Sequence, residues 1–396
     1  MSASELESAR DARTGSSRLP GQGNAPLRLA FLVDSPSRRA HGNAASRLAL
    51  GLAQSGRAEA TIVCYSDDPP PAWLPGNVRI RRLGADRVTR ALPSLVRYLR
   101  EDQPDVLITR QVHANFVGLA AAWMARMPPR WRGKLVLVQD HLVELCHAAN
   151  WRDNKWLAKA GYRLADGFIA PSPTVRDDTI RWCGLNPALT ALVPNPIPRF
   201  SGPLAAAPHP WLRDGEPPVF INVSNMLPFK RLDLVIDAFA LLRRQHDARL
   251  LLLGDGVGRA GADEQIGRLG LTGSAQTVGW IDDPLQFAAR AWSLVHSSDE
   301  DGFAQVLTEA MSVGCPVITT DAQGGGPRFV TEDGKFGLLV PRGDQAQLAA
   351  AMGRMLEPAL HAGYAELGRQ RSATMSPEAS ARTLLDFLAG PLGLSR

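Results

Sequence analysis

The stretch that decides the fold is residues 297–329, which read SSDEDGFAQVLTEAMSVGCPVITTDAQGGGPRF. An acidic residue, Asp301, precedes a glycine-containing turn, and a second acid, Glu309, follows eight positions later. A Gly-Cys-Pro break, the apolar run 317–320 and a glycine-rich turn at 324–326 come next. This order predicts strand, loop, helix, strand and loop, with carboxylates and free backbone N–H groups at one edge of an open parallel sheet.

Such an edge suits a nucleotide sugar, because carboxylates accept hydrogen bonds from hydroxyl groups and free N–H groups bind phosphate. A simpler interpretation explains part of the stretch. Val306, Leu307, Ala310 and Met311 fall at helical spacing, as in any amphipathic helix that packs on a sheet. That interpretation leaves the two acids and the glycine-rich ending unexplained.

The stretch resembles the signature of the group 1 family of retaining, GT-B-fold glycosyltransferases, E-G-F-x-x-x-x-x-E-A-M-A-x-G-x-P-V. The matching segments are Asp301-Gly302-Phe303, Glu309-Ala310-Met311 and Gly314-Cys315-Pro316-Val317. The first acid is Asp where the family has Glu, one methylene longer. The ending GGGPR at 324–328 resembles members that close this loop with G-G-P-R-E. The resemblance implies an α/β protein of the GT-B class, with two Rossmann-like doubly wound domains facing a central cleft.

Length and composition fit two domains. With 396 residues, 45% of them hydrophobic and 21% charged, the chain is long enough for two ordinary cores. Its longest near-apolar run, 116–125, is about half of a membrane span. Residues 1–25 lack the apolar core of a secretory signal and are expected to form a disordered tail. The cysteines show no metal-ligand spacing and are expected to pack as small hydrophobes in a reducing cytosol: Cys64, Cys146, Cys183 and Cys315.

Strands alternate with helices in two parts of the chain, which predicts parallel βαβ units. In the first part, strands are expected at 29–33, 61–65, 78–83, 104–108, 135–138 and 167–170, with helices at 44–52, 92–99, 114–125 and 156–164. In the second, strands are expected at 219–223, 250–253, 276–279, 293–296 and 317–320, with helices at 232–242, 263–269 and 376–388. The predicted domains are an acceptor domain at 26–198, a proline-rich linker at 199–216, a nucleotide-sugar domain at 217–375 and a crossover helix at 376–396.

Charge is divided unevenly between the halves. Residues 1–198 carry 26 Lys and Arg against 17 Asp and Glu, whereas the remainder carries 18 against 22. This asymmetry suggests an anionic partner for the first half, although a solvated arginine-rich surface explains it as well. No nucleic-acid motif is present. An anionic membrane carrying a lipid-linked acceptor fits better with the resemblance to the glycosyltransferase family.

The second domain resembles the family in its donor-binding segments. Residues 224–233, SNMLPFKRLD, resemble G-R-L-x-x-x-K-G-x-D, in which an Arg and a Lys clamp the donor diphosphate. Lys230 matches the Lys, but Asn225 stands where the family has Arg and brings no charge. Arg231 and Arg328 are the candidate substitutes. Lys230 as an ordinary surface lysine is the alternative.

Further donor contacts follow from the resemblance. Gly254 and Gly256 resemble the V-G-D-G turn near the base, and Trp280 and Ile281 resemble an L-G-W segment at the base edge. Glu309 is expected to accept from the ribose hydroxyls and Asp301 from a sugar hydroxyl. The remaining donor-loop positions are Gly302 and the backbone N–H groups of Phe303 and Ala304.

The first domain is expected to supply the acceptor side. Gly42 and Asn43 lie in the stretch 37–43, SRRAHGN, which loosely resembles a phosphate-contacting loop. His141 follows the fifth expected strand and resembles the family's T-x-H segment, where the His lies over the sugar; a helix-capping His is the alternative. His113, after the fourth strand, is a weaker candidate facing the acceptor.

We therefore expect a metal-independent retaining glycosyltransferase of the cytoplasm, peripheral at the inner face of the membrane. It would move a hexose or N-acetylhexosamine from a UDP- or GDP-linked donor to a glycan or lipid-linked acceptor in surface polysaccharide synthesis. His141, Asp301 and Lys230 would be its catalytic residues, and no cofactor is expected. A degenerate, non-catalytic GT-B subunit and a sugar-nucleotide 2-epimerase are the alternatives.

Overall fold

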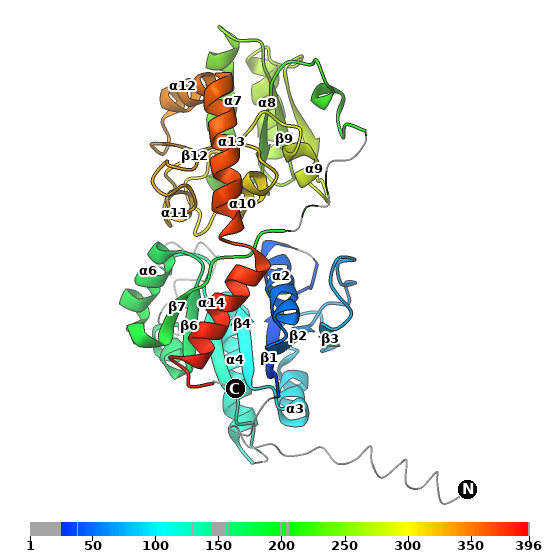
Figure 1. The fold of residues 1–396 in the computed structure, drawn as a ribbon, viewed down its shortest axis with the longest axis vertical. Helices are drawn as coiled ribbons and strands as arrows, with labels where there is room; N and C mark the ends of the chain where they lie inside the picture. The colour runs from blue at the N-terminus through cyan, green and yellow to red at the C-terminus, as the bar shows by residue number, and fades with distance from the viewer. Residues whose placement is uncertain are drawn as a thin grey trace, which may run out of the picture.

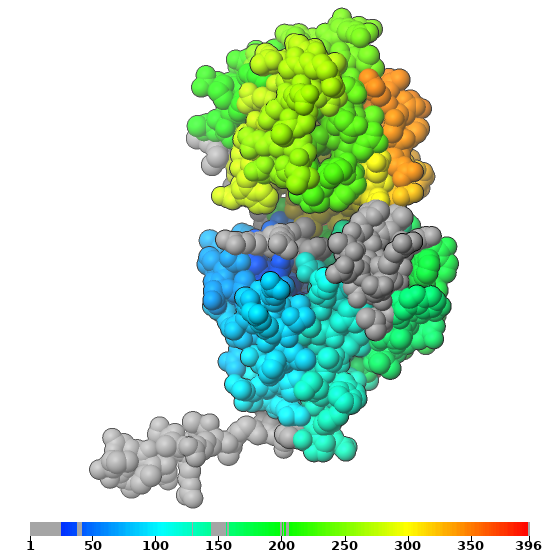
Figure 2. Space-filling view, turned by 180° about the vertical axis from the view of Figure 1, so that it is seen from behind, coloured from blue at the N-terminus to red at the C-terminus, as the bar shows by residue number. Residues whose placement is uncertain are grey.

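A computed structural model describes residues 25–394, apart from residues 38, 129, 144–155, 157, 199, 201 and 203–205. The expected disordered tail, except Ala25, and Cys146 lie outside the described residues. Two lobes are stacked along the long axis of the molecule (Figure 1), and the view from behind shows the same two lobes (Figure 2). Each lobe contains one parallel sheet, as the alternating pattern predicts.

The first sheet has seven parallel strands in the order β3-β2-β1-β4-β5-β6-β7. Its strands are β1 (Leu27–Val33), β2 (Ala58–Cys64), β3 (Arg79–Arg82), β4 (Val106–Arg110), β5 (Lys134–Val138), β6 (Gly167–Ala170) and β7 (Thr190–Leu192). The central strands read as almost continuous apolar runs, because helices cover both faces of the sheet. The helices of this domain are α2 (Arg39–Ser55), α3 (Leu92–Asp102), α4 (Val112–Arg126) and α6 (Pro173–Cys183).

The second sheet has six parallel strands in the order β10-β9-β8-β11-β12-β13. They are β8 (Val219–Val223), β9 (Arg249–Leu253), β10 (Ala275–Gly279), β11 (Ser293–His296), β12 (Val317–Thr320) and β13 (Leu338–Val340). Seven helices follow or flank them: α7 (Leu232–Arg243), α8 (Arg259–Arg268), α9 (Leu285–Ala288), α10 (Gln305–Ser312), α11 (Gly326–Thr331), α12 (Gln345–Met355) and α13 (Pro358–Ala373). The structure confirms the α/β, GT-B-like class predicted for the chain.

Two apolar clusters build each domain, one on either face of its sheet. In the first domain, α3 and α4 cover one face, while α2 covers the other together with α14 (Pro377–Ala389) from the end of the chain. In the second domain, α7, α8 and α12 cover one face, and α9 and α10 cover the other. Among the described residues, no helix is long and apolar enough to cross a membrane.

The chain passes between the domains twice, at the linker and at the segment before α14. The two passages lie side by side, because Ile197 N–H donates to the Met375 carbonyl at 2.9 Å. Helix α14 then lies along α2 on the first domain (Figure 1). It begins with Ser376 as N-cap and Pro377 at the first helical position, the residue types that favour a helix start.

One expected loop is absent. Residues 37–43 were predicted to form a phosphate-contacting loop before a helix at 44–52, but α2 already begins at Arg39. Gly42 allows this part of α2 to approach the backbone of Ser35 closely, since a Cβ there would lie 2.0 Å from the carbonyl oxygen of Ser35. Gly42 and Asn43 therefore sit in the first turns of α2, not in an open loop.

Candidate active site

Three loops meet at the carboxyl ends of β8, β9 and β10. Gly254 and Gly256 have φ angles of +126° and +151°, and a Cβ on either would collide with the backbone carbonyl of Ser224 or Asn225. Only glycine allows this approach. Gly254 N–H also donates to the Gly279 carbonyl at 2.8 Å. The segments expected near the nucleotide base are thus neighbours.

The exposed side chains at this edge are polar or aromatic. Asn225 is exposed, and Trp280 is 68% exposed, with its ring N–H donating to Asp282 at 2.9 Å. Ile281 instead packs partly buried against the apolar cluster of α9 and α10. A flat aromatic surface at the carboxyl edge of a sheet is suited to stacking on a planar base.

Asp301 is the centre of a hydrogen-bond network. Its Oδ2 accepts from Lys230 Nζ at 2.9 Å and lies 3.3 Å from His296 Nε2. Its Oδ1 accepts from the backbone N–H groups of Phe303 and Ala304, the two residues just before α10. The carboxylate thereby holds the turn that leads into the helix, in which Ala304 adopts a left-handed conformation at φ 57°.

The electrostatics of this network keep Asp301 ionised. Burial alone would raise the pKa of Asp301, but the positive charge of Lys230 and the hydrogen bond from His296 outweigh it and hold the pKa well below the usual range. Burial lowers the pKa of His296, although Asp301 opposes that shift. We infer that His296 is neutral at pH 7 and that Lys230 is the cation of the network.

His296 was not predicted as a site residue. It ends β11, and the apolar run before it made the whole segment look like an ordinary buried strand. The available signal was a histidine at the carboxyl end of a parallel strand, five positions before Asp301. Its other ring nitrogen lies 2.9 Å from Thr319 Oγ1 on the neighbouring strand, which fixes the ring.

A second cation sits beside the network. Arg231 pairs with Asp233 at 2.9 Å and with Asp299 at 3.4 Å, and its hydrogen bonds to these aspartates raise the pKa of the guanidinium. The expectation of a metal-free site rested partly on a missing D-x-D pattern, but residues 299–301, Asp-Glu-Asp, spell that pattern. Both aspartates of the pattern are engaged by cationic side chains.

Glu309, the second acid of the stretch, contacts the opposite domain. Its Oε1 accepts from Arg47 Nη1 on α2 at 2.8 Å and from Gln305 Nε2 at 3.0 Å. The Arg47 and Glu309 side chains are 10% and 19% exposed. Arg47 was not predicted, and the sequence signal was a charged residue within the small and apolar stretch 44–53.

The first domain has its own buried ion pair, at the carboxyl ends of β4 and β5. Arg110 donates to both carboxylate oxygens of Asp140 and also to Asn195 Oδ1 at 2.7 Å. The next residue, His141, is exposed. A Cβ on Gly302 would lie 2.0 Å from the Asp140 carbonyl oxygen, so the acidic loop of the second domain touches the strand end that carries His141.

Two more predicted residues lie exposed in short or early helical turns. Arg328 is 51% exposed at the start of α11, where it pairs with Asp321 and Asp333. These ion pairs, formed through its hydrogen bonds, raise its pKa. His113 is exposed on the first turn of α4, on the first domain.

Comparison with known families now decides the assignment. Residues 42–199 match the family model described as Glycosyltransferase Family 4, and residues 206–370 match Glycosyl transferases group 1. The chain belongs to the group 1 family of glycosyltransferases. The two models divide this group 1 chain close to the predicted linker.

Two bacterial relatives of this group 1 chain are named as sugar transferases. It is 30% identical over 176 residues to the lipopolysaccharide core biosynthesis glycosyltransferase LpsE of Rhizobium meliloti, covering 44% of this chain and 50% of that one. It is 26% identical to N-acetylgalactosamine-N,N'-diacetylbacillosaminyl-diphospho-undecaprenol 4-alpha-N-acetylgalactosaminyltransferase of Campylobacter jejuni, covering 60% and 64%. The matches thus span about half to two thirds of these relatives.

A solved structure shares the fold over nearly its whole length. HepE of Anabaena, crystallised with UDP and glucose, superposes with a TM-score of 0.73 at 20% identity, covering 92% of this chain and 99% of that one. At this identity the likeness shows the fold alone. It agrees with the two facing parallel sheets of the group 1 chain.

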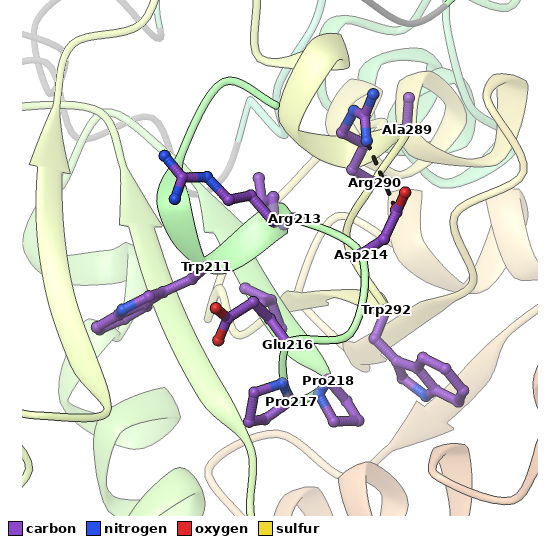
Figure 3. Close-up of a pocket in the computed structure, with 11 residues that line it drawn as sticks. Trp211, Arg213, Asp214, Glu216, Pro217, Pro218, Ala289, Arg290 and Trp292 are labelled. Carbon is purple, nitrogen blue, oxygen red and sulfur yellow. Dashed lines mark ion pairs between the residues drawn. The ribbon is translucent and has the colours of Figure 1, made fainter. Parts of the chain in front are cut away.

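A cavity lies at the other edge of the second sheet. It has a volume of about 370 Å³ and opens where β8 begins. Figure 3 shows Trp211, Glu216 and Trp292 in its wall, and an ion pair of 3.9 Å between Arg290 and Asp214. Ligands of open α/β sheets bind beyond the carboxyl ends of the strands, so we give this cavity no part in donor binding by the group 1 chain.

The tight contact at Gly302 yields a prediction. Gly302→Ala should push the two domains apart, because the added methyl group collides with the Asp140 carbonyl, at a cost on the order of 1–3 kcal/mol. We expect a larger radius of gyration in small-angle X-ray scattering with an unchanged far-UV spectrum. Gly267→Ala in α8 is the control, since nothing lies within 4 Å of that position. An unchanged radius in Gly302→Ala would contradict the contact.

Proposed function

We propose that the chain is a retaining glycosyltransferase that moves a hexose or N-acetylhexosamine from a nucleotide-diphosphate sugar to a glycan or lipid-linked acceptor. One observation carries the proposal. Lys230, the start of α10 and Glu309 lie together at the carboxyl edge of the second sheet, facing the strand end with His141. A cation for phosphate and a carboxylate for ribose hydroxyls are the two recognition elements that a nucleotide sugar needs.

Lys230 would stabilise the leaving diphosphate. An ammonium group has three N–H donors, and Asp301 takes one of them, so the others remain for phosphate oxygens. Stabilising the charge that develops on the leaving group would then be the main catalytic contribution, and the leaving phosphate would help to deprotonate the acceptor. This arrangement does not require a metal ion to bind the donor.

The hydrogen bonds of Asp301 change the role expected for the backbone N–H groups of Phe303 and Ala304. The N–H groups of Phe303 and Ala304 already donate to Asp301 Oδ1. They can reach a sugar or phosphate oxygen only if Asp301 releases them. We therefore propose that Asp301 shapes the loop and positions Lys230, and that it meets the sugar hydroxyl only after this rearrangement.

The non-catalytic alternative rests on the same loop. All four hydrogen bonds of the Asp301 carboxylate stay within the protein, and Asn225 supplies no charge where the family has Arg. A subunit that had lost turnover would tolerate both features. A 2-epimerase has less support, because both family models that match the chain describe glycosyltransferases.

A donor panel tests the proposal. The protein is incubated with individual UDP- and GDP-linked sugars, and its melting temperature and the slow hydrolysis of each donor are measured. UDP-glucose is the first choice, because HepE was crystallised with it. A donor at 100 times its Kd should stabilise the fold by about 2.7 kcal/mol. Stabilisation with hydrolysis supports the enzyme, stabilisation without turnover on any acceptor supports the non-catalytic subunit, and no effect of any donor rejects both.

We also propose peripheral contact with an anionic membrane. Trp123 and Leu164 are 65% and 71% exposed, and Met127 is 43% exposed, on a part of the first domain where Arg130 and Arg132 are exposed too. Exposed apolar side chains beside arginines suit a negatively charged lipid surface. Sedimentation with phosphatidylglycerol vesicles, but not with phosphatidylcholine vesicles, is expected, and should weaken in Trp123→Ser. Equal sedimentation of both proteins would reject this surface.

A further inference from the structure

The ion pair between Arg47 and Glu309 joins the two domains. Arg47 lies on α2 of the first domain and Glu309 on α10 of the second, 262 positions later in the chain. Their atoms Nη1 and Oε1 are 2.8 Å apart, and both side chains are at least four-fifths buried. A buried pair of this kind holds its geometry, because separating it leaves an uncompensated charge in a poorly solvated place.

The pair leaves one oxygen of Glu309 available. Arg47 and Gln305 both donate to Oε1, which uses the two acceptor positions of that oxygen. Among the described residues, no hydrogen bond reaches Oε2. The carboxylate is thus oriented from one side by Arg47, with the second oxygen left to accept from a pair of vicinal hydroxyl groups.

Two neighbouring atoms are also unmatched within the described part of the chain. Arg47 Nε and Gln305 Oε1 are buried and have no hydrogen-bond partner there. The distance from Arg47 Nη1 to the Pro196 carbonyl oxygen, just before the linker, is 3.5 Å, at the limit of a hydrogen bond. A buried donor and a buried acceptor without partners cost free energy, so the protein side chains alone do not satisfy this cluster.

We propose that Arg47 is a positioning residue of the donor site, which holds Glu309 so that the ribose is bound tightly only when the two domains are closed. The inference rests on the proposed function, since it takes Glu309 as the ribose contact. Because Arg47 comes from the opposite domain, ribose binding and domain closure favour each other by the same factor. The first domain thereby contributes to binding a donor that otherwise contacts the second.

The test measures the binding of UDP and of GDP by calorimetry. Wild type is compared with Arg47→Ala, Glu309→Gln and the double variant. Arg47→Ala should weaken nucleotide binding about tenfold. The double variant should have the same affinity as the single variant that binds less tightly, because the two residues act as one unit. Arg47→Lys should recover part of the affinity. Arg79→Ala is the matched control. That arginine belongs to the same domain, but its side chain is 71% exposed and forms a loose ion pair of 3.7 Å with Glu59 of its own domain.

If Arg47 only stabilised the fold, nucleotide binding would not be coupled to domain closure. The second measurement is therefore the radius of gyration with and without saturating nucleotide. Wild type should contract on binding, and Arg47→Ala should contract less. Unchanged affinity in Arg47→Ala, strictly additive losses in the double variant, or equal contraction would each overturn the inference while leaving the proposed function intact. A wild type that binds neither nucleotide would overturn the proposed function and this inference with it.

Discussion

Replacing Lys230 with alanine is expected to reduce donor turnover by a factor on the order of 10²–10³, the loss typical of removing one preorganised group that stabilises a developing negative charge. Lys230 is the cation of the Asp301 network, and its side chain is only 17% exposed. The nearest arginine of the same segment, Arg231, is already bound to Asp233 and Asp299 and cannot readily replace it. Initial rates with the donor identified in the panel measure the effect.

The control for this loss is Lys335→Ala. That lysine also pairs with a carboxylate, Glu332 at 3.4 Å, but its side chain is 64% exposed. Its removal should leave turnover unchanged, since exposed pairs contribute little. Because Lys230→Ala leaves Asp301 without its cation, the double variant with Asp301→Asn should regain part of the lost stability. Wild-type rates in Lys230→Ala would show that other residues hold the diphosphate, and Arg328 would be tested next.

Asp301→Asn is expected to be the second most damaging change. The amide cannot accept all four of the hydrogen bonds that the carboxylate accepts, and Lys230 loses its buried counterion, which should cost about 3 kcal/mol of unfolding free energy at pH 7. Turnover should fall as well, because the loop and Lys230 lose their positions. Asp86→Asn is the control, since Asp86 pairs with Arg90 on an exposed surface.

The stability lost in Asp301→Asn should depend on pH in a defined direction. The pKa of Asp301 is lowered on folding, so its contribution to stability is fully present above the unfolded pKa of about 3.9 and is lost as pH falls through the folded value. Urea unfolding should therefore show a constant difference between wild type and Asp301→Asn from pH 7 to about pH 5. The difference should shrink only in stronger acid. A difference that already disappears near pH 6 would point to His296 instead.

The strands of the second domain were the easiest elements to predict. The expected ranges 219–223, 293–296 and 317–320 coincide with β8, β11 and β12. Each is a short, mainly apolar or β-branched run followed by a polar residue, and central parallel strands buried on both faces have this composition. The ends of these strands could therefore be predicted from the local sequence alone.

Helix starts were harder to predict. The Gly-rich turn at 324–326 was treated as a loop, yet α11 begins at Gly326 with Pro327 in its first turn. Glycine usually weakens a helix, but here a Cβ on Gly326 would lie 2.4 Å from the backbone nitrogen of Phe303. The close contact with Phe303 therefore requires glycine at position 326, whereas helix propensity alone predicts a loop there.

The sequence predicted the motif residues of the site but not the residues that contact them. Asp301, Glu309 and Lys230 lie in segments whose pattern points to ligand binding, and the structure brings Asp301 and Lys230 together. Their partners lack such a pattern. Arg47 is 262 positions from Glu309, and His296 sits in an ordinary buried strand. Contacts between distant segments depend on how the two domains dock, which periodicity does not describe.

The return of α14 to the first domain has a consequence for biosynthesis. Ala381, Leu384, Leu385, Phe387 and Leu388 complete the apolar cluster between the first sheet and α2, and Gly51 lies against the Pro377 carbonyl. A ribosome that has made the first domain has not yet made this part of its core. The nascent first domain must therefore keep one face of its sheet and helix uncovered while the whole second domain is synthesised. Domains usually fold as units in the order of synthesis, but here the domain that is made first is the last to be finished.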